Sequence, residues 1–80
     1  MSKENTLNPY EQLANAIVLQ AVRDYRTALK RLSKNPRSKD ALAVKDECER
    51  FFRSSWYENL TSVDAEYLIR KLNEEVYYDI

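Results

Sequence analysis

The chain has 80 residues with no His and one Cys, and its 13 basic and 13 acidic side chains give a formal net charge of zero. These features argue against a disulfide-bonded fold, against a zinc site made of Cys and His, and against a global attraction to nucleic acid or membranes. The apolar fraction of 44% is enough for one small hydrophobic core.

Glycine is absent from the sequence, which rules out glycine-rich phosphate loops and tight Asn-Gly hairpins. Good helix formers dominate instead, so we expect an all-α fold. The uncharged run at 13–22 is too short and too polar to cross a bilayer. The first five residues lack the basic-then-apolar layout of a secretory signal. We therefore expect a cytoplasmic protein without a membrane partner.

The first helix is predicted to begin at Pro9, because Asn8 can cap it and Glu11 can complete a capping box. No breaker follows until about Ser33. The apolar residues cover about half of the helix circumference, which is wide enough for two neighbouring helices. Within this arc, positions 14, 18, 21, 25, 28 and 32 follow the alternating spacing of a coiled-coil seam. Either helices of the same chain or a second copy, as a homodimer, would cover this seam.

Two shorter helices are predicted after the break at residues 34–38. Ser38 caps the first of them, which ends near Ser54 and Ser55. Thr61 or Ser62 caps the other. The apolar face of the second helix comprises Ala41, Val44, Cys48, Phe51 and Phe52. The apolar face of the third comprises Ala65, Leu68, Ile69, Leu72 and Val76.

A short connection at 56–60 is expected between these two helices, with Trp56 and Leu60 filling the junction. The sequence thus predicts a three-helix bundle with one long N-terminal helix and two shorter helices. Residues 1–8 are expected to be a flexible N-terminus, and residues 9–80 a single helical domain.

Side chains suited to catalysis are few. Cys48 lies in the middle of an apolar face and has no His to activate it, which indicates a buried structural thiol. The carboxylates of the second and third helices are expected on solvated faces, with local ion pairs to Lys45, Arg50 and Arg53. We therefore expect no catalytic residue, no metal site and no cofactor, and hence no enzyme.

The charges are unevenly distributed along the chain. Residues 23–39 hold seven basic residues and one acid, whereas residues 40–80 hold five basic and ten acidic residues. A row of four cations lies opposite the apolar arc of the first helix, and two more extend it around the helix end. The row is Arg23, Arg26, Lys30 and Lys34, and the extension is Arg31 and Arg37.

Two explanations of this row remain open. The cations can complement the helix dipole and pair with the acidic second helix, or they can bind phosphates or an acidic protein surface. The tyrosines outside the predicted core face of the third helix, Tyr67, Tyr77 and Tyr78, suit a protein interface. Tyr77 and Tyr78 can equally fold back over the core. The candidate partner-binding residues are these six cations and three tyrosines.

The segment from Phe51 to Tyr57, followed by Leu60-Thr61, Asp64 and Leu68-Ile69, resembles a group of short uncharacterised proteins encoded by phages and prophages of Gram-positive bacteria. Residues 21–26 and 28–34 fit the same pattern, so the resemblance covers roughly residues 14–76. Members of the group often have Gly where this chain has Ala65. The resemblance implies the cytoplasm of a bacterial host, where very short phage proteins without enzymatic equipment are often inhibitors or adaptors of host machinery.

The function that we expect is therefore a non-enzymatic protein-interaction module that binds a host or phage protein, and its finer form is an inhibitor of a host enzyme or defence complex. The alternative is a nucleic-acid-associated accessory or regulatory protein that uses the basic row. The third helix argues against a helix-turn-helix reader of DNA, because Asp64 and Glu66 at its start would repel phosphate.

Overall fold

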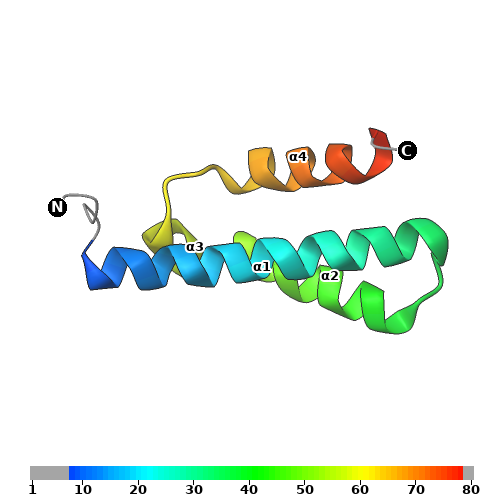
Figure 1. Cartoon of the computed structure of the whole chain (residues 1–80), viewed down its shortest axis with the longest axis horizontal. Helices are drawn as coiled ribbons and strands as arrows, with labels where there is room; N and C mark the ends of the chain where they lie inside the picture. The colour runs from blue at the N-terminus through cyan, green and yellow to red at the C-terminus, as the bar shows by residue number, and fades with distance from the viewer. Residues whose placement is uncertain (1–7, 79–80) are drawn as a thin grey trace, which may run out of the picture.

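The computed structural model of the chain describes residues 8–78, and every regular element in this range is a helix. The helices are α1 (Pro9–Lys34), α2 (Lys39–Phe52), α3 (Ser55–Leu60) and α4 (Ala65–Tyr78) (Figure 1). The prediction of an all-α fold with one long N-terminal helix is confirmed. The flexible N-terminus is predicted over residues 1–8. Residues 1–7 lie outside the described residues, and Asn8 is the N-cap of α1.

The start of α1 is fixed by the capping box that the sequence predicts. The backbone N–H of Glu11 donates to Oδ1 of Asn8 at 2.8 Å, and the backbone N–H of Asn8 donates to Oε1 of Glu11 at 3.2 Å. The helix continues to Lys34, one residue beyond the predicted end. It stops there because the residue before Pro36 is disfavoured in the helical region.

The segment after α2 differs from the prediction. Ser38 caps α2 as expected, with its side chain accepting from the N–H of Ala41 at 3.3 Å. Ser54 then caps a further short helix by accepting from the N–H of Tyr57 at 3.2 Å. The predicted short connection is therefore the helix α3, and the chain has four helices rather than three among its described residues.

This extra helix changes which aromatic ring fills the junction. The prediction for Trp56 is wrong, since its side chain is 56% exposed, whereas Tyr57 is 1% exposed. Successive helical residues are about 100° apart, so turning Tyr57 toward the core turns Trp56 toward solvent. Leu60, one turn after Trp56, is buried as predicted.

The start of α4 also differs from the prediction. The side chain of Asp64, rather than that of Thr61 or Ser62, accepts from the N–H of Tyr67 at 2.9 Å. Thr61 instead follows the last residue of α3, and its hydroxyl oxygen accepts from the N–H of Val63 at 3.2 Å. An aspartate is a strong N-cap, so the acid expected in the first turn serves as the cap itself.

The hydrophobic core gathers side chains from all four helices. Its centre is Phe52, which is fully buried and packs edge-to-face on Tyr25 and Tyr57, with ring centroids 5.6 and 5.7 Å apart. The core comprises Val22, Tyr25, Leu29, Cys48, Phe52, Tyr57, Ile69, Leu72 and Val76. A smaller cluster of Ala28, Leu32 and Ala41 closes the other end of the contact between α1 and α2.

Helix α1 is the element on which the others pack, since it contacts α2, α3 and α4. The wide apolar arc therefore meets more than one neighbour, as predicted. Figure 1 shows that α4 lies along the C-terminal half of α1, and the N-terminal half extends beyond it. Tyr10 and Leu13, expected on the apolar face, are more than half exposed there, and Val44 of α2 is also exposed. Among the described residues, no helix is long and apolar enough to cross a membrane.

We expect Phe52→Ala to lower the free energy of unfolding by about 3–5 kcal/mol, because it removes a fully buried ring from the centre of the core. Trp56→Ala, at the mostly exposed neighbour, should cost less than about 1 kcal/mol. Urea unfolding followed by circular dichroism at 222 nm measures both. Equal losses for the two variants would contradict this arrangement of α3.

Candidate functional site

Four of the predicted partner-binding cations lie together where α1 ends. Lys30, Arg31 and Lys34 belong to the last two turns of α1, and Arg37 lies in the turn that leads to α2. All four side chains are exposed, and none forms an ion pair in the part of the chain that the structure describes. We call these four residues the basic surface.

The backbone at the end of α1 favours cations at the basic surface even without a bound partner. The last carbonyl groups of a helix carry a partial negative charge, which favours cations in the final turn by about 0.3–1 kcal/mol each. Arg31 and Lys34 occupy this turn. The turn itself is held by the side chain of Asn35, whose Oδ1 accepts from the N–H of Arg37 at 3.3 Å.

The other two cations of the row have different environments. Arg23 is exposed and also has no ion pair with a described residue. Arg26 instead binds Glu75 of α4 in a bidentate pair, with Nε and Nη2 donating at 2.7 and 2.9 Å. The expected pairing of the row with the second helix is therefore wrong for Arg26, which attaches α4 to α1. The hydrogen bond to Arg26 lowers the pKa of the Glu75 carboxyl.

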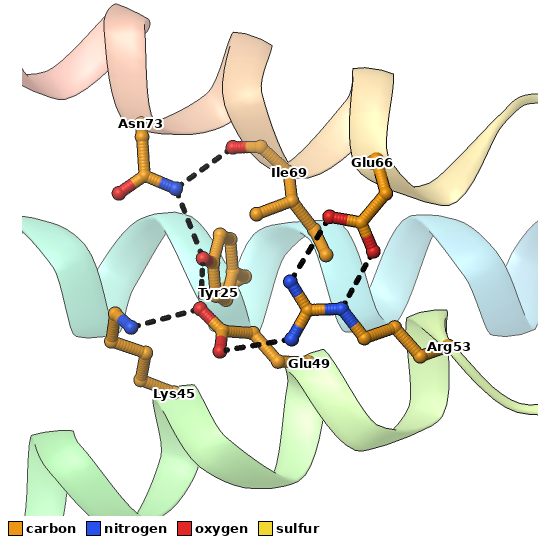
Figure 2. A network of polar contacts seen from close by, with 7 residues as sticks. All are labelled: Tyr25, Lys45, Glu49, Arg53, Glu66, Ile69 and Asn73. Carbon is orange, nitrogen blue, oxygen red and sulfur yellow. Dashed lines mark hydrogen bonds and ion pairs between the residues drawn. The ribbon is translucent and has the colours of Figure 1, made fainter.

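A polar network joins the three longer helices next to the core (Figure 2). The hydroxyl of Tyr25 in α1 donates to Oε2 of Glu49 in α2 at 2.6 Å. The same hydroxyl accepts from Nδ2 of Asn73 in α4 at 3.0 Å, and Asn73 also donates to the carbonyl of Ile69 at 2.8 Å. Lys45 donates to Oε2 of Glu49 at 2.8 Å. Every polar atom named here has a partner, which is the condition under which a buried network stabilises a fold.

The network continues to the surface through Arg53. Its Nη1 lies 3.7 Å from Oε1 of Glu49, and its Nε and Nη2 donate to Glu66 of α4 at 2.7 and 3.1 Å. Figure 2 shows the guanidinium between the two carboxylates. The predicted ion pairs of the α2 acids with Lys45 and Arg53 are confirmed, whereas the predicted pair with Arg50 is wrong, since Arg50 forms none with a described residue. The sequence does not predict the contacts to Tyr25 and Glu66, because helical periodicity carries no information on which helices meet.

The charge state of Glu49 is set by these contacts. Burial raises the pKa of its carboxyl, but the hydrogen bonds from Lys45 and Tyr25 outweigh burial, and the pKa lies below its usual value. Burial also raises the pKa of the Tyr25 hydroxyl, and the neighbouring Glu49 carboxylate raises it further. At neutral pH the Glu49 carboxylate is therefore charged and accepts hydrogen bonds, and the Tyr25 hydroxyl is protonated and donates one. The network has a structural role.

The predicted tyrosine sites are resolved only in part. Tyr67 is 49% exposed on α4, and two cations lie over its ring, Arg70 at 5.4 Å and Lys71 at 5.6 Å from the centroid. It belongs to α4 and is not one of the residues at the basic surface. The side chains of Tyr77 and Tyr78 lie outside the described residues.

Cys48 is buried between α1 and α2, and its thiol donates weakly to the carbonyl of Ala21 at 3.7 Å. Burial first, and then the carboxylates of Asp24, Glu47 and Glu49, raise the pKa of this thiol to about 11. The thiol is therefore protonated at neutral pH and is a poor nucleophile. Among the described residues, no group of three or more His, Cys, Asp or Glu side chains is placed to hold a metal ion.

A cavity of about 540 Å³ lies between α3 and the start of α4. Tyr57 and the Arg53–Glu66 ion pair contribute to its lining. The Tyr57 hydroxyl has no hydrogen-bond partner in the described part of the chain, and its oxygen has almost no exposed surface. A ligand in the cavity would not reach this hydroxyl unless the lining residues moved. The unsatisfied hydroxyl therefore lowers the stability of the fold locally and is not part of a binding site.

Comparison with known proteins finds no match to a family model, to a curated protein or to a solved structure. The resemblance to short phage proteins therefore stays a prediction.

Tyr25→Phe should lower the free energy of unfolding at pH 7 by about 1.5–3 kcal/mol, because it removes a hydrogen bond to a partly buried, charged carboxylate. The pKa of Glu49 is lower in the folded chain than in the unfolded chain. Its contribution is therefore complete above the unfolded value of about 4.3 and is lost as the pH falls through the folded value. The effect of Tyr25→Phe should accordingly be smaller at pH 2.5 than at pH 7.

Urea unfolding at both pH values measures this difference. Tyr10→Phe is the matched control, since the Tyr10 side chain is 62% exposed, and it should leave stability unchanged at either pH. An effect of Tyr25→Phe that is the same at pH 2.5 and pH 7 would contradict the assigned contact to Glu49.

Proposed function

We propose that this chain is a non-enzymatic protein-interaction module that binds an acidic surface of another protein through its basic surface. The observation that carries the proposal is the absence of an ion pair at Lys30, Arg31, Lys34 and Arg37 within the described residues. Arg26, Lys45 and Arg53 are used inside the fold, where each binds a carboxylate at 2.7–2.8 Å. The basic surface has no such internal role.

A grouping of unpaired cations favours association with an anionic partner in two ways. It steers the diffusional encounter, and it supplies donors for charge-assisted hydrogen bonds after docking. The cations also repel one another, and a carboxylate-bearing partner relieves this repulsion. The basic surface is thus better suited to a bound complex than to the isolated chain.

The charge on the rest of the chain favours a protein partner over nucleic acid. Residues 40–80 hold ten acidic and five basic residues. Asp46, Glu47 and Glu58 among them are exposed and form no ion pair with a described residue. A polyanion longer than the basic surface would meet these carboxylates, whereas a compact acidic patch on a protein would not.

The resemblance to short proteins of phages and prophages supports the finer form of the proposal. In that context the partner is a host or phage protein in the bacterial cytoplasm, and a small chain that covers an acidic site on a host enzyme or defence complex acts as its inhibitor. This part of the proposal rests on analogy with such proteins.

The test is affinity capture from a host lysate, with and without nuclease, using the wild-type chain and the double variant Lys34→Glu/Arg37→Glu. We expect a protein partner that nuclease does not remove and that the double variant fails to retain. The matched control is Arg50→Glu/Arg70→Glu, which changes the charge equally at exposed positions elsewhere and should retain the partner.

A binding assay with a short DNA duplex provides the opposing outcome. Each neutralised phosphate contributes about −0.9 to the slope of log affinity against log salt on duplex DNA. Micromolar or tighter binding with such a slope, lost in Lys34→Glu/Arg37→Glu, would establish the nucleic-acid alternative and contradict the proposal. We expect no detectable binding even at low salt.

A further inference from the structure

The hairpin of α1 and α2 has two long sides, and α4 covers only one of them. Glu49 lies on the covered side, where it reaches the network that includes Asn73 of α4. Glu47 is two positions earlier and hence about 200° away around the helix, so it faces the other side. Two adjoining cavities of about 370 and 310 Å³ lie on that other side, and Asp24 lines both of them. We call this the open groove.

On α1 the open groove follows a second regular seam. The residues concerned are Leu13, Ile17, Gln20, Asp24, Thr27 and Arg31, with alternating spacings of four and three. This is the spacing of the buried seam, shifted by one residue, and it is the spacing with which one helix packs along another. All six side chains are exposed except Ile17, which is half-buried. Helix α1 therefore presents a seam that no helix of the described chain covers.

One end of the open groove is apolar. Ile17, Phe51 and Trp56 line the cavity at this end. The Trp56 ring packs edge-to-face on Phe51, with centroids 5.5 Å apart, and is 56% exposed. A large aromatic ring that is held by a neighbour but left open to solvent is the kind of residue that anchors protein interfaces.

The charges along the open groove change in a fixed order. Asp24 and Glu47 line its middle. Both carboxylates raise the pKa of the Cys48 thiol, which is buried between the two helices. Asp24 accepts a hydrogen bond from Nε2 of Gln20 at 3.0 Å, and neither carboxylate forms an ion pair with a described residue. Arg31 lines the far end, where the basic surface begins. The groove is thus apolar, then acidic, then basic.

We propose that the open groove binds an amphipathic α-helix of the partner protein, with apolar side chains over Trp56, a basic residue near Asp24 and Glu47, and acidic residues against Arg31. The seam from Ile17 to Arg31 spans 14 residue steps, or about 21 Å at 1.5 Å per residue, so the bound helix is about four turns long. The inference rests on the proposed function, because the acidic end of this helix is the anionic surface that the basic surface would bind. It adds the shape and polarity of the bound segment.

The same order of charges disfavours a second copy of this chain as the occupant. A parallel pair of α1 seams sets Asp24 against Asp24 and Arg31 against Arg31. An antiparallel pair centred on the groove again sets Asp24 against Asp24. An antiparallel pair centred on Ile17 sets Asp24 against Tyr10 and leaves Arg31 beyond the first residue of the other α1. An antiparallel pair centred between positions 27 and 28 sets Asp24 against Arg31, but α1 ends at Lys34, so the apolar end of the groove at Ile17 and Trp56 stays uncovered. A partner helix of complementary charge order has none of these conflicts.

The test uses a displayed library of 16-residue amphipathic helices with randomised charges, selected against the full chain. We expect enriched helices to carry Lys or Arg in the middle and Asp or Glu at one end. Trp56 is the only tryptophan of the chain, so its fluorescence should shift to shorter wavelength when a selected helix binds. Trp56→Ala, followed with labelled helix, should weaken binding about thirtyfold, and Asp24→Lys about tenfold. Val63→Ala, which shortens an exposed apolar side chain away from the groove, is the control and should change nothing.

Three outcomes would overturn the inference: no helix is enriched; the enriched helices bind Trp56→Ala and Asp24→Lys as tightly as the wild type; or the chain alone dimerises with a concentration-dependent shift of its Trp56 fluorescence. Failure of the proposed function is distinguishable. A captured partner that Lys34→Glu/Arg37→Glu retains but Trp56→Ala and Asp24→Lys lose would contradict the role of the basic surface and leave the groove standing. The reverse pattern would overturn the groove and leave the proposed function standing.

Discussion

The arrangement of the helices depends on Tyr25, which places an aromatic ring and a hydroxyl at the one point where α1, α2 and α4 meet. Its ring is fully buried and packs on Phe52, and its hydroxyl binds Glu49 of α2 and Asn73 of α4. Burial of the ring stabilises the packing of the helices, but it does not fix their register along one another, because apolar contacts are not directional. The two hydrogen bonds are directional, so they fix how far α2 and α4 slide along α1.

This constraint has consequences for the two sides of the α1–α2 hairpin. The side that carries Glu49 is closed by α4, and the ion pairs of Arg26 with Glu75 and of Arg53 with Glu66 hold that helix in place. Both pairs are about half exposed, so each is worth little alone, and only the Arg53–Glu66 pair also belongs to the network around Glu49. No helix of the described residues covers the opposite side. The exposed Trp56 lies on this side, together with Asp24 and Glu47, whose carboxylates form no ion pair with a described residue.

The sequence predicts the local features of this fold well. The capping box of α1, the cap of α2 at Ser38 and the apolar face of α4 depend on residues within a few positions of each other, and all are confirmed. The predictions fail where a choice depends on the rest of the fold. Trp56 and Tyr57 are adjacent aromatic residues, and which of them turns inward depends on how α3 packs against Phe52 in the core.

The candidate site follows the same division. That Lys30, Arg31, Lys34 and Arg37 would cluster is evident from their spacing along a helix and its following turn. The sequence does not show that Arg26 is separate from this set, because its partner Glu75 is 49 positions away in the chain. The open groove is also hidden in the sequence, because its seam on α1 is mostly polar and is recognisable only once α2 lies beside it.

The central claim is that contacts within the chain divide its cations into structural ones and free ones, and nitrogen-detected NMR of the arginine side chains tests this directly. Hydrogen exchange at Nε should be slow for Arg26 and Arg53, whose Nε groups donate to carboxylates at 2.7 Å. It should be fast for Arg31 and Arg37, which have no such partner among the described residues. Slow exchange at Arg31 and Arg37, or fast exchange at Arg26 and Arg53, would contradict the account.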